Sequence, residues 1–133
     1  RMTASVIAGD GVFSHVFLGA AGLQASVAFY DAALAALSIK NLGPFGNGWV
    51  LYGRDKPALI VAKPGNGESP SSNGVTIGFA AATAAEVDAF HAAGLAAGGI
   101  DEGAPGPRGH LPLAYAAYLR DPAGNKVCAY AFV

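Results

Sequence analysis

The feature that most constrains the fold of this chain is an internal repeat. The segment HVFLGAAGLQASVAFYDAALAALSI, which begins at His15, aligns without a gap on TIGFAAATAAEVDAFHAAGLAAGGI, which begins at Thr76, at an offset of 61 residues. Alanine inflates such matches, so the weight rests on large apolar residues that coincide: Phe29 with Phe90, Leu34 with Leu95, and Ile39 with Ile100. Two copies are too few for a solenoid, which needs about three or more repeats, so the sequence predicts a duplicated module.

Each half shows the same order of elements. Residues 12–19 are β-branched and aromatic, which is typical of a strand, and residues 23–37 carry apolar side chains at steps of four and three, as in a helix that covers a sheet. Short strands are predicted at 48–53 and 58–62 in the first half, and at 113–120 and 126–132 in the second. Thr83 and Glu86 form a capping box that starts a second helix, which runs to about Ala97.

The predicted fold is therefore α+β, with two tandem β-α-β-β-β modules at residues 12–63 and 74–132. The linker between them, residues 64–73, is rich in Gly, Pro, Ser and Asn. A chain of 133 residues has the length of one domain, and such a domain buries about two thirds of its unfolded surface. We expect residues 1–133 to form one domain.

Charge and apolar patterning exclude several classes of partner. Eight Lys and Arg against nine Asp and Glu give a net charge of −1, and no basic run offers the patch that nucleic acid or an anionic membrane requires. No apolar stretch of about 18–20 residues predicts a membrane span, and the opening RMTASVIAGDG lacks the pattern of a signal peptide. The single cysteine cannot form an internal disulfide, which favours a reducing, cytoplasmic location.

Two segments carry a resemblance to a known family. HVFLGAAGLQASVAFYDAAL resembles the opening strand and helix of the vicinal oxygen chelate superfamily, which includes glyoxalases, bleomycin resistance proteins and extradiol dioxygenases. GGIDEGAPGPRGH followed by AAYLRDPAGNKV resembles the closing part of its small bacterial members, and the D-P-x-G-N-K run is the most telling piece. The resemblance covers almost the whole chain. It implies an eight-stranded sheet curled around a cleft, a homodimer, and in many members a divalent metal in the cleft.

The resemblance also implies where metal ligands would lie. Metal-dependent members draw them from the first strand, the matching strand of the second half and the last strand, commonly as His, His and Glu. Here those positions hold His15, Thr76 and Cys128, and a fourth position falls near Val61. One His and one Cys fall short of the three protein donors that a stable zinc site needs. We expect no metal cofactor at these positions, and a metal bound through other residues stays open.

Strand alternation predicts which side chains face the cleft, because residues two apart share a face. If Cys128 points inward, Tyr130 and Phe132 do so too, while Ala129 and Ala131 face the helices. The same rule joins Phe17 to His15, and Gly78 to Thr76. The sequence leaves the facing of two aromatic residues open, and a loop at residues 103–112 could close over a ligand. The predicted cleft residues are His15, Phe17, Trp49, Thr76, His110, Tyr115, Cys128, Tyr130 and Phe132.

Several of these residues also have structural interpretations. Cys128 can be a small buried apolar residue, and His15 a hydrogen-bonded remnant of a lost metal site. His91 and His110 are expected to be solvated, and the DPAGN residues Asp121 and Asn125 to form a turn. The aromatic residues can likewise fill a core.

A binding protein is the function that these features favour. The expected ligand is a small aromatic or amphipathic molecule in a mostly apolar cleft, as in metal-free bleomycin resistance proteins. One alternative is a metal-dependent lyase, transferase or dioxygenase of the same superfamily. Another is a metal-independent enzyme that uses His15, His110 or Cys128 for acid, base or nucleophilic work. Whether the protein catalyses any reaction is left open.

Overall fold

The internal repeat is present in the backbone. The computed structural model describes residues 12–133, so the expected absence of a signal peptide in residues 1–11 lies outside the described part. Strand β1 (Val16–Gly19) leads into helix α1 (Leu23–Ala35), and strand β5 (Thr76–Ala80) leads into helix α2 (Ala84–Ala96). The two helices begin and end at positions that correspond at the predicted offset of 61.

Three further strands complete each module. They are β2 (Lys40–Phe45), β3 (Trp49–Gly53) and β4 (Leu59–Ala62) in the first half, and β6 (Ile100–Pro107), β7 (Ala114–Arg120) and β8 (Lys126–Phe132) in the second. The predicted β-α-β-β-β order is thus confirmed twice. Strand β6 takes up half of the stretch that we expected to be a loop at 103–112, which corrects that prediction.

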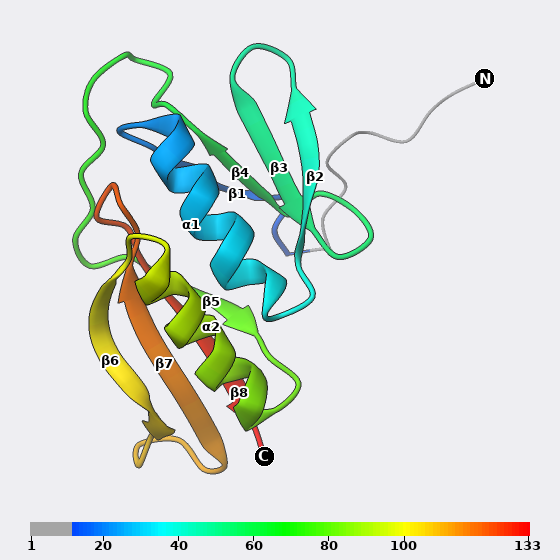
Figure 1. Ribbon diagram of the computed structural model, residues 1–133, viewed down its shortest axis with the longest axis vertical. Coiled ribbons are helices and arrows are strands. Elements are labelled where there is room, and N and C mark those ends of the chain that lie inside the picture. The colour runs from blue at the N-terminus through cyan, green and yellow to red at the C-terminus, as the bar shows by residue number, and fades with distance from the viewer. Residues whose placement is uncertain (1–11) are drawn as a thin grey trace.

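The eight strands form two four-stranded sheets of identical order, β1-β4-β3-β2 and β5-β8-β7-β6 (Figure 1). The first strand of each module pairs parallel with the last, and the other pairs are antiparallel. Phe17 lies opposite Ile60, as the equivalent Gly78 lies opposite Cys128. The structural counterpart of Cys128 is therefore Ile60 and not Val61, which corrects the loose alignment of the module ends.

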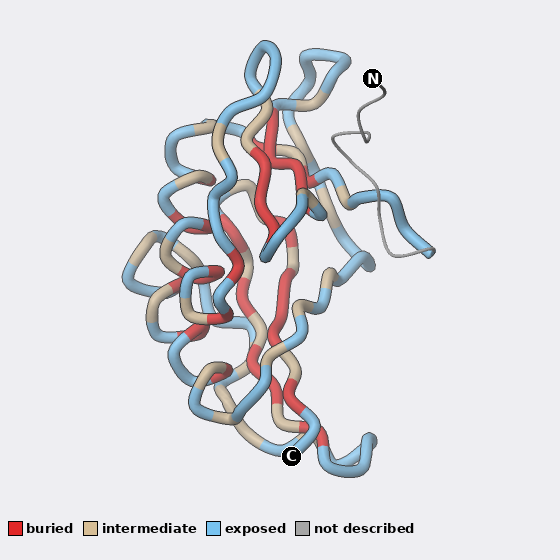
Figure 2. The backbone as a smooth tube through the Cα atoms, turned by 90° about the vertical axis from the view of Figure 1, so that its right-hand side faces the viewer, coloured by how far each residue is buried: buried red, intermediate tan, exposed pale blue. Residues whose placement is uncertain are grey.

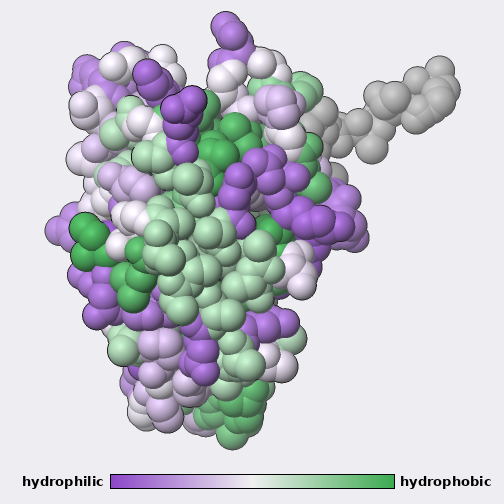
Figure 3. All heavy atoms as spheres, in the orientation of Figure 1, coloured by the Kyte–Doolittle hydropathy of each residue, from purple (hydrophilic) through white to green (hydrophobic). Residues whose placement is uncertain are grey.

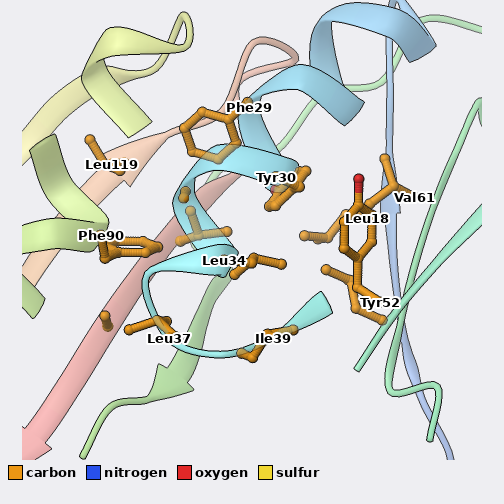
Figure 4. Close-up of a cluster of buried hydrophobic side chains, with 14 of the residues drawn as sticks. Leu18, Phe29, Tyr30, Leu34, Leu37, Ile39, Tyr52, Val61, Phe90 and Leu119 are labelled. Atoms are coloured by element: carbon orange, nitrogen blue, oxygen red, sulfur yellow. The ribbon is translucent and has the colours of Figure 1, made fainter. Parts of the chain in front are cut away.

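Both helices lie on one side of the strands (Figure 2). A single hydrophobic cluster joins the modules there, with Phe29 and Leu34 from α1, Phe90 from α2, and Leu119 from β7 (Figure 4). The outer sides of the helices carry many exposed alanines, which give this face its pale green colour in Figure 3. No helix within residues 12–133 is long and apolar enough to cross a membrane.

The opposite side of the sheets is not covered by the helices, and we call it the open face. Alternation along the strands separates the two sides. Val127, Ala129 and Ala131 belong to the helix-side core, as predicted for the two alanines. Cys128 and Tyr130 therefore point to the open face.

The turn between β7 and β8 holds the two modules together. Asp121 Oδ1 accepts hydrogen bonds from the backbone N–H groups of Ala123 and Asn125, both at 2.9 Å, which confirms the predicted turn. The same turn reaches the first module, because the Tyr30 hydroxyl donates to Asp121 Oδ2 at 2.6 Å. The Asn125 side chain also donates to the Gly19 carbonyl at 2.9 Å.

Candidate ligand-binding face

The open face of the second module is built around Cys128. The strand register places Gly78 of β5 on one side of it and Tyr118 of β7 on the other. A side chain at position 78 would meet the thiol, since a Cβ there would lie 3.4 Å from Sγ. Glycine therefore leaves the area beside Cys128 open.

Aromatic side chains continue this face. The rings of Tyr118 and Tyr130 meet edge to face with centroids 5.9 Å apart, and their hydroxyls form a short hydrogen bond. The ring of Phe132 lies next to that of Tyr130, with centroids 6.0 Å apart, and Phe132 is 64% exposed. Burial, with help from the hydrogen bond to Tyr130, raises the pKa of Tyr118 to about 12. At neutral pH this phenol is uncharged.

Two cations flank the Tyr118 ring. The Arg108 guanidinium carbon lies 5.3 Å from the ring centroid, and the Lys126 ammonium nitrogen lies 5.2 Å from it. The sequence did not predict Arg108, Tyr118 or Lys126 as residues of this face. If the strands on both sides of the DPAGN turn are paired residue by residue, Tyr118 lies opposite Cys128. This pairing could have identified Tyr118 from the sequence.

Cys128 is poorly suited to nucleophilic chemistry. Its side chain is buried, and burial raises the pKa of the thiol to about 11, although Lys126 and Arg108 act to lower it. The thiolate is the nucleophilic form of cysteine, and it is scarce at neutral pH under these conditions.

The open face of the first module carries a second aromatic group. Trp49 packs edge to face against Phe17, with centroids 6.1 Å apart, and lies 6.2 Å from Phe45. Leu51 and Ile60 form a small buried cluster with Trp49. The sequence left the side on which Trp49 lies undecided, and these contacts place it on the open face.

His15 belongs to a different environment. It is exposed, its Nδ1 lies 2.9 Å from Ser14 Oγ, and it lines a cavity of about 220 Å³ whose other lining residues also come from the first module. Thr76 is exposed on β5, diagonally across from Cys128 on the open face. Among residues 12–133, no recorded contact or cavity joins His15 to Thr76 or Cys128.

Of two other predicted residues, one lies on the helix side of its sheet and one lies outside the strands. Tyr115 and Tyr118 lie on opposite faces of β7. Tyr115 faces the helices, where its hydroxyl donates to Asp88 of α2 at 2.6 Å. Tyr115 therefore lies on the side of the sheet opposite Cys128, where it lines a cavity of about 380 Å³ with Arg108. His110 is exposed in the connection between β6 and β7.

His91 differs from the expectation of a solvated residue. It is only 8% exposed, and its Nε2 lies 2.8 Å from Asp101 Oδ1. Its place on α2 beside β6 encloses the imidazole between helix and strand, and the hydrogen bond from His91 lowers the pKa of Asp101.

A larger cavity lies where the modules meet. It has a volume of about 420 Å³ and is lined by the β3–β4 connection and by Gly78, Phe79 and Ala80 of β5. Arg54 bridges the modules at this point, donating to the carbonyls of Leu37 at 3.0 Å and Ala80 at 2.8 Å. The volume of this cavity falls in the range of small-molecule pockets, and the cavity borders the open face at Gly78.

The residues at the implied metal positions do not fit a divalent ion. No group of three or more His, Cys, Asp or Glu side chains that could hold a metal occurs among the described residues 12–133. A protonated thiol beside two cations is also an unfavourable ligand for a positive ion, because ligating cysteine must be deprotonated.

Comparison with known proteins gives matches at the level of structure. The chain matches no protein-family model and no curated protein. The crystal structure of a glyoxalase/bleomycin resistance protein from Albidiferax ferrireducens T118 is 43% identical, with a TM-score of 0.80 and coverage of 90% of this chain and 97% of that chain. A glyoxalase-related enzyme from Fulvimarina pelagi is 21% identical, with a TM-score of 0.69 and coverage of 88% and 86%. The second likeness shows a shared fold alone.

Proposed function

Because this chain belongs to the glyoxalase/bleomycin resistance protein family, we propose that it binds a small aromatic or amphipathic molecule at the open face without a divalent metal. The observation that carries the proposal is the row of Tyr118, Tyr130 and Phe132 beside Cys128. Aromatic faces with few polar groups are the usual lining of a small-molecule site. The cavity between the modules adds volume at the edge of this face.

Binding is favoured over chemistry by the protonation states of the face. The raised pKa values of Cys128 and Tyr118 keep both groups neutral near pH 7. A general base or nucleophile works best with a pKa near the working pH. The cytoplasmic location expected from the sequence agrees with a free thiol at Cys128.

We also propose that the protein is a homodimer. Large apolar side chains gather at one end of the second sheet, where Phe132 is 64% exposed and Leu113 is 70% exposed. Exposed apolar patches of this kind mark interaction sites. Sedimentation equilibrium tests this proposal, and a monomer at all concentrations would contradict it.

A fluorescence titration with N-phenyl-1-naphthylamine, a neutral aromatic probe, tests the binding proposal. We expect saturable binding that weakens roughly fivefold or more in Phe132→Ala, since an aromatic contact contributes about 1 kcal/mol or more. Leu95→Ala is the matched control, because it removes an exposed apolar side chain from α2, away from the open face. No saturable binding to the wild type, or equal effects of the two variants, would contradict the proposal.

Metal analysis tests the other half of the proposal. Protein purified without chelator should contain no stoichiometric divalent metal. The double change Thr76→His and Cys128→Glu adds only two donors, because His15 lies in a different environment, so it should raise the melting temperature with zinc, manganese or nickel no more than in the wild type. A stoichiometric metal in the wild type would overturn the proposal.

A further inference from the structure

Two cationic side chains from different parts of the second module make cation–π contacts with the Tyr118 ring. Arg108 follows β6 and Lys126 begins β8, and both lie within 5.3 Å of the ring centroid. Both side chains are half-buried. Two like charges gathered at a partly desolvated position repel one another. An anion bound to either cation reduces this repulsion.

Within the described part of the chain, neither cation has a carboxylate partner. Within residues 12–133 the recorded ion pairs are Arg120 with Glu102 and His91 with Asp101. Among residues 12–133, Arg108 donates to three neutral backbone carbonyls, those of Ala104 at 3.0 Å, Gly106 at 3.1 Å and Pro107 at 3.3 Å. A guanidinium has five N–H donors, so Arg108 keeps donors for a ligand.

Both Arg108 and Lys126 act on the Cys128 thiol, in the direction that favours its anion. The Tyr118–Tyr130 hydroxyl pair adds a neutral donor, because two hydroxyls that share one hydrogen bond keep one hydrogen free. An arginine fork, an ammonium and a phenol together match the oxygens of a carboxylate, sulfonate or phosphate.

We propose that the ligand of the open face is an aromatic small molecule with one anionic group, which is bound by Arg108 and Lys126 beside Tyr118 while its ring packs on Tyr130 and Phe132. This inference rests on the proposed function, since it names the ligand class for the same face. Arg108 and Lys126 are the residues that select the anion.

A matched pair of probes separates the two proposals. N-phenyl-1-naphthylamine and 8-anilinonaphthalene-1-sulfonate share the same rings, and only the second carries an anionic group. We expect the sulfonate probe to bind about tenfold more tightly at low salt, with the difference shrinking between about 20 and 500 mM salt as the charges are screened. If the neutral probe binds and the sulfonate probe binds no better, the anion site is refuted and aromatic binding stands. If neither binds, the proposed function fails first.

Variants then locate the anion site. Lys126→Gln should weaken the sulfonate probe about fivefold and leave the neutral probe unchanged, and Arg108→Lys should give a smaller loss because the charge remains but the fork is lost. Lys40→Gln is the matched control, since Lys40 is an exposed lysine on β2 at the far edge of the other sheet. Equal effects of Lys126→Gln and Lys40→Gln would overturn the assignment. Competition by benzoate and phenyl phosphate, but not by benzyl alcohol, is expected, and it identifies which oxyanion the site prefers.

Discussion

At the scale of single residues, a buried carboxylate decides how the two modules meet. Asp121 is 2% exposed and accepts four hydrogen bonds, from two backbone N–H groups, the Asn125 amide and the Tyr30 hydroxyl. A buried charge is tolerated only when its hydrogen bonds are satisfied. Burial beside this carboxylate also raises the pKa of Tyr30, which keeps the phenol protonated as a donor.

Replacing Tyr30 by Phe should therefore lower the free energy of unfolding by about 1.5–3 kcal/mol, because it removes one donor from a buried carboxylate. Tyr115→Phe is the control, since it removes a hydrogen bond of the same 2.6 Å length to the exposed Asp88, and we expect a loss below about 1 kcal/mol. Urea unfolding of both variants measures the difference. Equal losses would show that burial of Asp121 has no energetic consequence.

The Cys128 thiol offers a pH-dependent prediction. Because its pKa is raised from 9.0 to about 11, the thiolate fraction near neutral pH is about a hundredfold lower than for an unperturbed cysteine. We expect iodoacetamide to label the native protein slowly, with a rate that rises about tenfold per pH unit until pH 11. Protein unfolded in denaturant is the control and should label with an ordinary thiol profile. A native rate that levels off near pH 9 would contradict the raised pKa.

At the scale of elements, helix α2 approaches β7 and α1 closely because of one glycine. A Cβ at Gly94 would lie 2.4 Å from Leu119 Cδ1 and 3.1 Å from Phe29 Cε1, and both of these side chains are fully buried. Glycine is otherwise unfavourable inside a helix, by about 1 kcal/mol relative to alanine. The close packing of the helices explains why it is present.

Gly94→Ala should thus destabilise the protein by about 1–3 kcal/mol, against the gain in helix propensity, because the added methyl overpacks the core. Combining it with Leu119→Val removes part of the clash, so the alanine should cost less in that background. Thermal melts of the four proteins in this cycle measure the coupling. An increase in stability from Gly94→Ala alone would contradict the packing argument.

The elements differ in how far the sequence predicts them. The helices were predictable because their apolar periodicity and the Thr83 cap are local, and Thr83 Oγ1 indeed accepts a hydrogen bond from the Glu86 N–H at 3.1 Å. The first and last residues of strands β2 and β6 could not be predicted from the sequence. Both are edge strands with Gly and Pro, and both pair with irregular register, so tertiary pairing overrides their local preference.

The open face was predictable only in part. Alternation along one strand assigned Tyr130 and Phe132 to the face of Cys128, since that rule needs no partner strand. The positions of Arg108 and Lys126 over Tyr118 depend on side-chain paths from two other elements. The side on which Tyr115 lies stayed open, because the sequence did not define which face of β7 meets α2.

At the scale of the whole molecule, the two modules share one core. Its buried cluster draws on α1 and β4 from the first module and on α2, β7 and β8 from the second. Hydrogen bonds from Asn125 to Gly19 and from Arg54 to Ala80 cross the boundary as well. Neither module therefore buries its apolar surface alone, although the linker at residues 64–73 lies outside all strands and helices.

Fragments 1–68 and 69–133 should accordingly lack cooperative unfolding when separate, and should regain it when mixed. Each separate fragment leaves its half of the shared core exposed. The free energy gained by apolar burial is then too small to offset the loss of conformational entropy in a chain of this length. Near-ultraviolet circular dichroism with thermal melts measures the recovery. The control is the intact chain with a Gly-Ser insertion that doubles the linker, which should cost only about 0.6 kcal/mol. A cooperative melt of either fragment alone would show that the modules are independent folding units.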